Sequence, residues 1–276
     1  MTHADLFSLE GKVVVVTGGG GLLGEQHGRA IMQAGGHPVL LDIDGAKVSA
    51  VADAISRNTG LEVLALQADV TDPSSLEAAR DEVVQERGRI DGLVNNAAVD
   101  AKVSGELEWD EPTRLEQLTL ERWDRELGVG LTGAFLCSRV FGSHMAGHGG
   151  GVIVNVSSDL GVLAPDQRLY RKPQLSEDEQ PVKPVTYSVV KHGMVGLTRY
   201  LATYWTKQGV RCNCLCPGGV QDDQSDAFVQ RVEQLIPMGR MASVDEYHGA
   251  IVFLLSKASD YLNGHMLLVD GGRSVW

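Results

Sequence analysis

Tyrosine and lysine side chains stand four positions apart in Tyr187-Ser-Val-Val-Lys191, at the start of an expected helix over 187–207. This spacing puts both side chains on one face of a helix. A phenol has a reference pKa of about 10, and a neighbouring ammonium group favours its ionised form. The pair can therefore act as a general acid and base near neutral pH. Because such pairs also arise on helices by chance, the motif alone is weak evidence.

Two serines follow an expected strand over 151–156. A hydroxyl at that strand end is able to hold a substrate oxygen while Tyr187 handles the proton. Ser157 and Ser158 are both in place for this role, and helix capping or a turn is the alternative reading of either one.

A glycine-rich loop, Thr17–Gly24, lies between an expected strand over 13–17 and an expected helix over 22–34. Glycines keep such a turn tight and let the backbone approach a pyrophosphate, while the helix N-terminus supplies N–H groups and a positive dipole end. Asp42 ends the next strand, where a carboxylate accepts the ribose hydroxyls and repels a 2′-phosphate. The pattern predicts NAD(H) rather than NADP(H), although Asp42 is also explained by a turn at Asp44-Gly45.

Further polar residues follow the next two expected strands. Asp69 stands where it would meet an adenine amino group. Asn95, Asn96 and Ala97 come at the carboxyl edge, where open α/β sheets bind ligands. We expect Asn95 to tie strands together and Asn96 and Ala97 to face the cofactor, with ordinary turn chemistry as the alternative.

Strand and helix patterns alternate along the whole chain, which predicts parallel βαβ units. Asp72 is a predicted N-cap with Pro73 as the first helical residue, and Ser243 with Glu246 forms a predicted capping box. The expected strands are 13–17, 39–42, 63–66, 90–94, 151–156, 210–215 and 266–269, and the expected helices are 22–34, 48–57, 73–87, 187–207 and 243–256.

We therefore predict a single α/β domain over residues 1–276, built on a Rossmann-like, doubly wound parallel sheet of about seven strands with helices on both faces. Two stretches interrupt the alternation. Residues 100–116 are acidic and rich in turn formers. Residues 161–184 are rich in proline and charge, and we interpret them as an inserted loop on the substrate side, because long loops in compact domains are usually functional lids or disordered.

Composition excludes several classes of protein. The formal net charge of −12 leaves no basic footprint for nucleic acid. The first apolar run is too short for a signal peptide and no apolar stretch approaches ~18 residues, so we expect a cytoplasmic protein without a membrane partner. Cys212, Cys214 and Cys216 alternate as on one face of a strand, and with Cys137 they are expected to be buried thiols rather than metal ligands or disulfides.

These segments, in this order, resemble the short-chain dehydrogenase/reductase family over essentially the whole chain. The resemblance rests on Thr17–Gly24, Asp42, Asp69-Val70, Asn95–Ala97, Asn155–Ser158, Tyr187–Lys191, Pro217-Gly218 and Val269–Gly272. It implies strand order 3-2-1-4-5-6-7 and a homo-oligomer, dimer or homotetramer, built on the long helices before and after the fifth strand.

The resemblance also assigns roles. It implies Tyr187 as the acid/base, Lys191 as its partner that also touches the nicotinamide ribose, and Ser158, the second serine, as the catalytic one. Val220 would meet the nicotinamide carboxamide. The NAD-binding residues it implies are Gly18, Leu22, Leu23, Asp42, Ile43, Asp69, Val70, Asn96, Ala97, Tyr187, Lys191, Pro217, Gly218 and Val220.

The chain departs from the family pattern at three positions. Leu22 replaces a third glycine of the phosphate loop, and Ala98 replaces a glycine after the Asn-Asn-Ala run. Gly130 stands where the family has a catalytic asparagine that kinks a helix and holds a water for the proton relay. With Gly128 and Gly133 nearby a kink remains accessible, but the relay must run through water or another group.

The insert, the start of the glycine loop and Pro217-Gly-Gly are more loosely similar to members of bacterial surface-glycan and flagellin-glycan sugar pathways. We therefore expect NAD(H)-dependent interconversion of a secondary alcohol and a ketone on a sugar-derived small molecule. Arg168, Tyr170, Arg171 and Lys172 are candidates to meet a phosphate or carboxylate, against the alternative of a solvated loop.

Two other functions stay open. One is a reductase of acyl or other non-sugar ketones. The other is an NAD(H)-binding sensor with low turnover, which Gly130 motivates and the intact Ser158, Tyr187 and Lys191 oppose.

Overall fold

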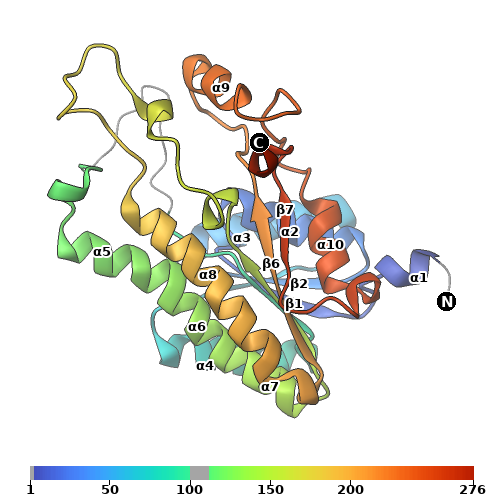
Figure 1. Ribbon diagram of the computed structural model, residues 1–276. Coiled ribbons are helices and arrows are strands. Elements are labelled where there is room, and N and C mark those ends of the chain that lie inside the picture. Colours follow the sequence, from blue (N-terminus) through green and yellow to red (C-terminus); the bar gives the residue numbers. More distant parts are fainter. Residues whose placement is uncertain (1–2, 100–111) are drawn as a thin grey trace.

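The central element is one seven-stranded, all-parallel sheet with strand order β3-β2-β1-β4-β5-β6-β7 (Figure 1). The computed structural model describes residues 3–99 and 112–276. The predicted strand order and the Rossmann-like class are confirmed. The strands are β1 (Val13–Thr17), β2 (His37–Asp42), β3 (Leu64–Gln67), β4 (Gly92–Asn95), β5 (Gly151–Val156), β6 (Val210–Pro217) and β7 (Met266–Val269).

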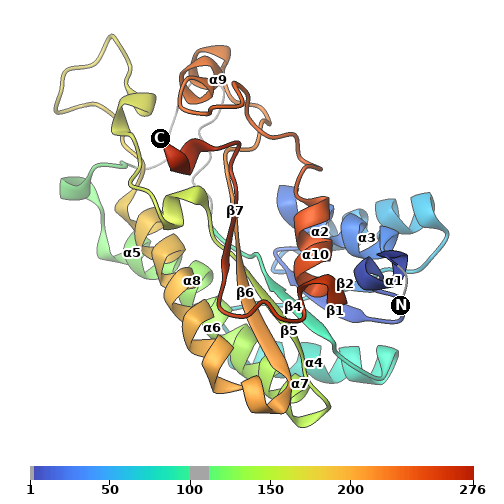
Figure 2. The ribbon, with the colours of Figure 1, turned by 45° about the vertical axis from the view of Figure 1, so that its right-hand side comes forward.

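Helices cover both faces of the sheet, as Figures 1 and 2 show. They are α1 (His3–Phe7), α2 (Leu22–Gln33), α3 (Gly45–Thr59), α4 (Pro73–Arg87), α5 (Leu120–Leu127), α6 (Gly133–Cys137), α7 (Ser143–Gly147), α8 (Val185–Tyr204), α9 (Asp226–Glu233) and α10 (His248–Leu255).

The strand β1 shows why two layers of helix are needed. Val13 and Val15 pack into a core with α4, α6, α7 and α8, whereas Val14 and Val16 pack into a second core with α2, α3 and α10. Successive side chains of a strand point to opposite faces, so an all-valine strand can be buried only between two helical layers. The predicted doubly wound arrangement is confirmed.

Helix caps follow the sequence closely at α3 and α4. The Asp72 side chain accepts a hydrogen bond from the backbone N–H of Ser74, and Pro73 is the first residue of α4, as predicted. The Asp44 side chain caps α3 by accepting from the N–H of Lys47. Such caps satisfy N–H groups that have no partner within the helix.

One long helical segment, for which the sequence analysis set no bounds, connects the chain to β5. It begins at Leu120 and runs through α5, α6 and α7 with two wider π-helical turns, Gly128–Thr132 and Ser138–Gly142. The first π turn contains Gly130, so the irregularity that glycines were expected to permit is present there.

The predicted start of the helix before β7 is wrong. Helix α10 begins at His248, and the Ser243 hydroxyl donates to Asp245 (2.7 Å) instead of capping a helix. The Glu246 carboxylate does accept from the N–H of Ser243 (2.9 Å), so half of the capping box forms. Tyr247, fully buried, donates its hydroxyl to the Gly218 carbonyl (3.1 Å), which holds this turn against the end of β6.

Three segments meet beyond the carboxyl ends of the strands, at the top of Figure 1: the insert, α9 and the C-terminal turn. Tyr170 of the insert packs against Phe228 of α9, with ring centroids 5.8 Å apart. The Trp276 indole N–H donates to the Leu235 carbonyl (2.9 Å). We call the shared apolar cluster the apolar cap; it consists of Leu169, Tyr170, Phe228, Val232, Ile236 and Met241.

The stretch 100–116, expected to be acidic loop, falls mostly outside the described residues. From residue 112 the chain is described, and Thr113 and Arg114 bond to the insert: the Thr113 hydroxyl accepts from the N–H of Val182 (3.0 Å), and Arg114 donates to the Glu177 carbonyl (3.0 Å).

Candidate active site

A cleft of about 530 Å³ opens at the carboxyl edge of the sheet, below the apolar cap. Parallel strands all end at this edge, so residues distant in sequence converge there. Twelve of the predicted site residues line the cleft: Gly18, Leu22, Leu23, Asp42, Asn96, Ala97, Ser158, Tyr187, Lys191, Pro217, Gly218 and Val220.

Three predicted cofactor residues do not line this cleft. The Ile43 side chain lies on the surface, 66% exposed. Val70 is buried in the core against Gly133, and the Asp69 carboxylate accepts from both the N–H (2.8 Å) and the hydroxyl (2.7 Å) of Thr71 in a local turn. Their contacts with a cofactor stay predictions.

The phosphate loop makes a cradle that larger side chains would fill. Gly18 has a positive φ of 63°, a conformation that favours glycine. A Cβ added to Gly24 would lie 2.0 Å from the Gly18 carbonyl oxygen. Helix α2 begins at Leu22, after an N-cap glycine that has no side chain to cap it. Backbone N–H groups at this helix start are suited to an anion such as a pyrophosphate, with Leu22 in place of the third glycine.

Asp42 connects the end of β2 to this loop. One carboxylate oxygen accepts from the N–H of Gly20 (3.0 Å) and the other from the N–H of Asp44 (3.1 Å). The sequence analysis missed Lys47, which also lines the cleft and lies beside Gly20. The helix after β2 was expected to begin at Val48, so Lys47 was not placed in its first turn, whereas α3 begins at Gly45.

The two asparagines at the end of β4 bond to different partners. Asn95 donates to Asn155 of β5 (2.8 Å) and to Ser138 (3.0 Å), and is buried. It therefore ties neighbouring elements together. Asn96 donates to the carbonyls of Thr17 (3.0 Å) and Gly18 (3.3 Å), which fastens the phosphate loop to β4 beside the cleft.

The two serines after β5 are also distinguished by their bonds. The Ser157 hydroxyl donates to the Lys191 carbonyl (2.7 Å) and so anchors α8. The Ser158 hydroxyl donates to the Asp159 carboxylate (2.8 Å) and accepts from the N–H of Leu160 (3.2 Å). Ser158 thus caps the short 3-10 turn Asp159–Gly161, the capping role given as its alternative, and it also lines the cleft.

Tyr187 and Lys191 lie on one face of α8, as the spacing predicts. The Lys191 ammonium donates to the Val156 carbonyl at the end of β5 (3.1 Å) and lies 5.7 Å from the centroid of the Tyr187 ring. Lys191 is buried. The ammonium is thus held between the strand end and the phenol, where its charge favours the phenolate form.

A buried ion pair borders Ser158. The second oxygen of Asp159 accepts from the Arg273 guanidinium (2.9 Å), and only 3% of the Asp159 side chain and 11% of the Arg273 side chain are exposed. The pair connects the serine to the C-terminal turn after β7. Sequence reasoning missed it, because nothing in the spacing joins residues so far apart along the chain.

The three basic residues of the insert that were candidates to meet an anion, Arg168, Arg171 and Lys172, do not line the cleft. Arg168 pairs with Asp166 (2.7 Å) and Arg171 pairs with Glu177, both at the surface. Tyr170 lines the cleft, and the lysine of the insert that lines it is Lys183. Its ammonium lies over the Tyr187 ring, 3.8 Å from the centroid.

Gly130, which stands at the family's asparagine position, makes a close contact between helices. A Cβ added there would lie 2.6 Å from a methyl carbon of Val190, the residue before Lys191. The side chain of Val190 thus occupies the space beside α8 that a larger residue at position 130 would need.

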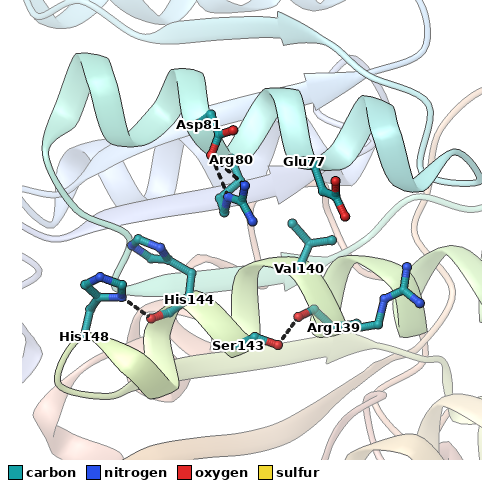
Figure 3. A pocket seen from close by; sticks show the side chains of 8 residues that line it. All are labelled: Glu77, Arg80, Asp81, Arg139, Val140, Ser143, His144 and His148. Carbon is teal, nitrogen blue, oxygen red and sulfur yellow. Dashed lines mark hydrogen bonds and ion pairs between the residues drawn. The ribbon is translucent and has the colours of Figure 1, made fainter.

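A second hollow, shown in Figure 3, lies between α4 and the helical segment that leads to β5. Its polar groups bond to one another: Arg80 with Asp81 (2.7 Å), and the His148 ring with the His144 carbonyl (2.7 Å). Its lining includes neither a residue of the glycine loop nor one of the three predicted catalytic residues.

The four cysteines are free thiols and are buried. Cys214 and Cys216 lie side by side on β6, with sulfurs 3.8 Å apart. Among residues 3–99 and 112–276 there is no cluster of three or more His, Cys, Asp or Glu side chains placed to hold a metal. No helix in the same ranges has the length and apolar character needed to cross a membrane.

Comparison with known proteins places the chain in a family. The model described as short chain dehydrogenase matches residues 12–170, and the model described as Enoyl-(Acyl carrier protein) reductase matches residues 176–274. The chain belongs to the short-chain dehydrogenase/reductase family. It is accordingly an oxidoreductase that acts on CH–OH groups.

Three proteins illustrate the likeness. D-threitol dehydrogenase of Mycolicibacterium smegmatis is 34% identical over 98% of this chain and 95% of its own length. Post-translational flagellin modification protein A of Campylobacter coli is 30% identical over 96% and 98%, which agrees with the looser similarity to flagellin-glycan pathways. The structure of a gluconate 5-dehydrogenase from Burkholderia cenocepacia, in complex with NADP and tartrate, superposes with a TM-score of 0.85 at 28% identity and covers all of both chains.

Proposed function

We propose that this protein interconverts a secondary alcohol and a ketone on a polyol or sugar-derived substrate, with Tyr187, Lys191 and Ser158 as its catalytic residues. The observation that carries the proposal is the convergence of these three side chains with the phosphate loop in one cleft. Similarity to D-threitol dehydrogenase and to gluconate 5-dehydrogenase supports a polyhydroxylated substrate.

The chain's own residues supply the proton chemistry. A bound nicotinamide accepts or supplies the hydride. In alcohol oxidation the substrate O–H proton passes to the Tyr187 phenolate, which the Lys191 ammonium stabilises. Ser158 holds the substrate oxygen. The Lys191 ammonium donates a hydrogen bond to the Val156 carbonyl (3.1 Å), which fixes the lysine of α8 against the end of β5.

The cofactor proposed is NAD(H). Asp42, fixed by the N–H groups of Gly20 and Asp44, presents a carboxylate where the adenosine ribose would lie. It accepts ribose hydroxyls and repels a 2′-phosphate. NADP-binding proteins of similar fold exist, including the gluconate 5-dehydrogenase, and Lys47 lies close enough to the same corner of the cleft to favour a phosphate.

The substrate end of the cleft combines an apolar wall from the apolar cap with polar side chains. Asp222, Asp223 and Gln224 line it on the segment after β6. The Gln224 amide bonds to the backbone of Asp222 (2.8 Å) and Val220 (3.0 Å). Carboxylates accept hydrogen bonds from hydroxyl groups, which suits a substrate with several hydroxyls better than a simple ketone.

The test is NADH formation, followed by absorbance, with NAD⁺ and a panel that contains D-threitol, gluconate, and free, phosphorylated and nucleotide-linked sugars. Activity on one class that is lost in Tyr187→Phe, with NADH binding retained, is the expected result. Substantial turnover in Tyr187→Phe would remove the tyrosine from its central role.

The runner-up is reduction of acyl or other non-sugar ketones; the match of residues 176–274 to a model named for a reductase of acyl substrates supports the acyl part. NADH oxidation with acyl ketones, together with silence on the sugar panel, would establish it. NADH binding with no turnover on either panel would favour the sensor instead.

We further propose a homo-oligomer, up to a homotetramer, in the cytoplasm. Aromatic side chains on the outer faces of the helices around β5 support an interface: Phe135 of α6 is 48% exposed, and Tyr200 and Tyr204 of α8 are 60% and 58% exposed. Exposed apolar patches of this kind mark association surfaces. Molar mass from light scattering decides between monomer, dimer and tetramer.

A further inference from the structure

A lysine stands four residues before Tyr187, just ahead of α8, and another stands four residues after it, on α8. Lys191 is the partner that the family motif supplies. Lys183 comes from the end of the insert, and its ammonium is the nearer of the two to the Tyr187 ring: 3.8 Å from the centroid against 5.7 Å for Lys191. Both side chains line the cleft.

The backbone around Lys183 is fixed by other segments. Its N–H donates to the Gln167 side chain (2.8 Å), and the N–H of Val182 donates to the Thr113 hydroxyl (3.0 Å). Pro184 follows and caps α8, with φ −56°, the value to which its ring restricts it. Lys183 therefore reaches the tyrosine from a tethered segment rather than from a free loop.

The insert itself is held in shape by Gln180. Its buried side chain accepts from the N–H of Lys172 (2.8 Å) and donates to the carbonyls of Lys172 (3.0 Å) and Leu175 (2.6 Å). With Tyr170 packed on Phe228, the insert is anchored at both ends and in the middle. Its position relative to α8 is thereby set.

We propose that Lys183 is a second cation for Tyr187, which stabilises the phenolate and so sets the pH at which the proton acceptor is available. The inference rests on the proposed role of Tyr187. An ammonium over an aromatic face is attracted to the ring, and the attraction is greater for a phenolate because the ring then carries negative charge. Lys183 acts through the tyrosine and is a positioning residue.

The other charged groups around this end of α8 are largely compensated. Asp159 is paired with Arg273 (2.9 Å), and Glu126 of α5 bonds to Thr186 and pairs with Arg122 (2.7 Å). Asp222 and Asp223 face the cleft from the segment after β6 and oppose the effect of the lysines. The two ammonium groups closest to the ring are the ones that favour phenolate.

The experiment compares pH profiles of kcat/KM for alcohol oxidation in the wild type, Lys183→Met and Lys183→Arg, on the panel substrate that the wild type oxidises. We expect Lys183→Met to shift the acid limb of the profile to higher pH by about one unit. The kcat/KM of this variant should then be about tenfold lower than that of the wild type at pH 7 and equal to it at alkaline pH. Lys183→Arg should keep most of the wild-type profile. Lys207→Met, exposed beyond the far end of α8, is the matched control.

Superimposable wild-type and Lys183→Met profiles would overturn the inference. So would an equal loss at every pH, because a purely structural or substrate-binding role lowers the rate without moving the limb.

A second readout needs no substrate. Ultraviolet difference titration of the phenolate band, with Tyr187→Phe in each background as the blank, should place the Tyr187 transition about one pH unit higher in Lys183→Met. Identical transitions would contradict the inference even if the proposed reaction holds. A shifted transition in a protein whose activity survives Tyr187→Phe would instead contradict the proposed reaction while keeping the contact between lysine and phenol.

Discussion

At the scale of single residues, we propose that Asp42 governs the choice between NAD(H) and NADP(H). Its carboxylate is held by two backbone N–H groups, those of Gly20 (3.0 Å) and Asp44 (3.1 Å), and Lys47 lines the same corner of the cleft. The Asp42 carboxylate repels a 2′-phosphate and the Lys47 ammonium attracts it. Removing the carboxylate should therefore leave the attraction of Lys47 for the phosphate unopposed.

We predict that Asp42→Ala weakens NADH binding and improves NADPH binding, with a shift in preference of at least tenfold, corresponding to about 1.4 kcal/mol. The measurement is the pair of dissociation constants from quenching of protein fluorescence. In Asp42→Ala/Lys47→Ala the gain for NADPH should disappear. An unchanged preference in the single variant would rule out the ribose assignment.

The sequence predicted which residues gather in the cleft better at the strand ends and helix starts than on the substrate side. Tyr187, Lys191 and Ser158 sit at strand ends or helix starts, and topology alone brings them to one edge. Arg168 and Arg171 were candidates to meet an anion, with a solvated loop as the alternative, and each bonds to an acidic neighbour in the same loop. Hydrogen bonds between distant segments, such as that from the Val182 N–H to the Thr113 hydroxyl, decide which basic side chain of the insert faces the cleft. Such bonds have no sequence signature.

At the scale of elements, Gly130 and Val190 form a tight contact between two helices. An added Cβ would lie 2.6 Å from the valine methyl group, and a β-branched side chain has little rotational freedom in a helix with which to yield. Val190 immediately precedes Lys191, so a change in the distance between these helices would also move the lysine.

We predict that Gly130→Ala lowers the free energy of unfolding by about 1–2 kcal/mol, because overpacking outweighs the better helix propensity of alanine. Urea denaturation measures the loss. Gly128→Ala is the matched control in the same π turn, since a Cβ there meets nothing within 4 Å. Gly130→Ala/Val190→Ala should recover part of the loss, and no recovery would place the cause elsewhere.

Element bounds were predictable where local chemistry sets them. The helix that starts at Pro73 after the Asp72 cap was predicted with its ends correct, and so were β1, β5 and β7. The start of α10 was not, because the burial of Tyr247 and its bond to Gly218 hold a turn where the capping pattern predicted helix. The helical segment from Leu120 lacked a clear pattern because glycines and π turns break its periodicity.

At the scale of the whole molecule, stability depends on two cores on either side of the sheet. On the side of α2 and α10, His27 is fully buried, and neither ring nitrogen has a hydrogen-bond partner in the described residues. Burial, helped by the charge of nearby His248, lowers the pKa of His27 to about 3. The unfolded chain takes up a proton at this histidine below about pH 6.5, and the folded chain does so only near pH 3.

Acidification therefore favours the unfolded state through His27. The free energy of unfolding of His27→Leu minus that of the wild type should therefore rise as the pH falls. We predict a rise of about 1 kcal/mol for each pH unit from pH 6 down to pH 4. Comparing the two proteins removes the contributions of carboxylates common to both. His192→Leu, exposed on α8, is the control. A difference that does not vary with pH would show that His27 is already protonated or hydrated in the folded state.

The overall architecture was the most predictable level, because alternation of strand and helix patterns together with right-handed crossovers leaves few topologies. What sequence could not supply was the meeting of the insert, α9 and the C-terminal turn. These segments join through Tyr170 and Phe228 and through Trp276 and Leu235, contacts between parts of the chain far apart in sequence. The ion pair of Arg273 with Asp159 is another contact between residues far apart in sequence.

The buried thiols have a practical consequence. Cys137 lies on α6, and Cys212, Cys214 and Cys216 lie on β6, next to the edge strand β7. Burial raises the pKa of the Cys137 thiol to about 12 and raises that of Cys212 as well. Because only an exposed thiolate reacts readily, alkylating reagents will label the chain when the sheet or the helix opens. The rate of thiol labelling in the native protein, measured by mass spectrometry, therefore reports how often the structure opens locally, separately at α6 and at β6.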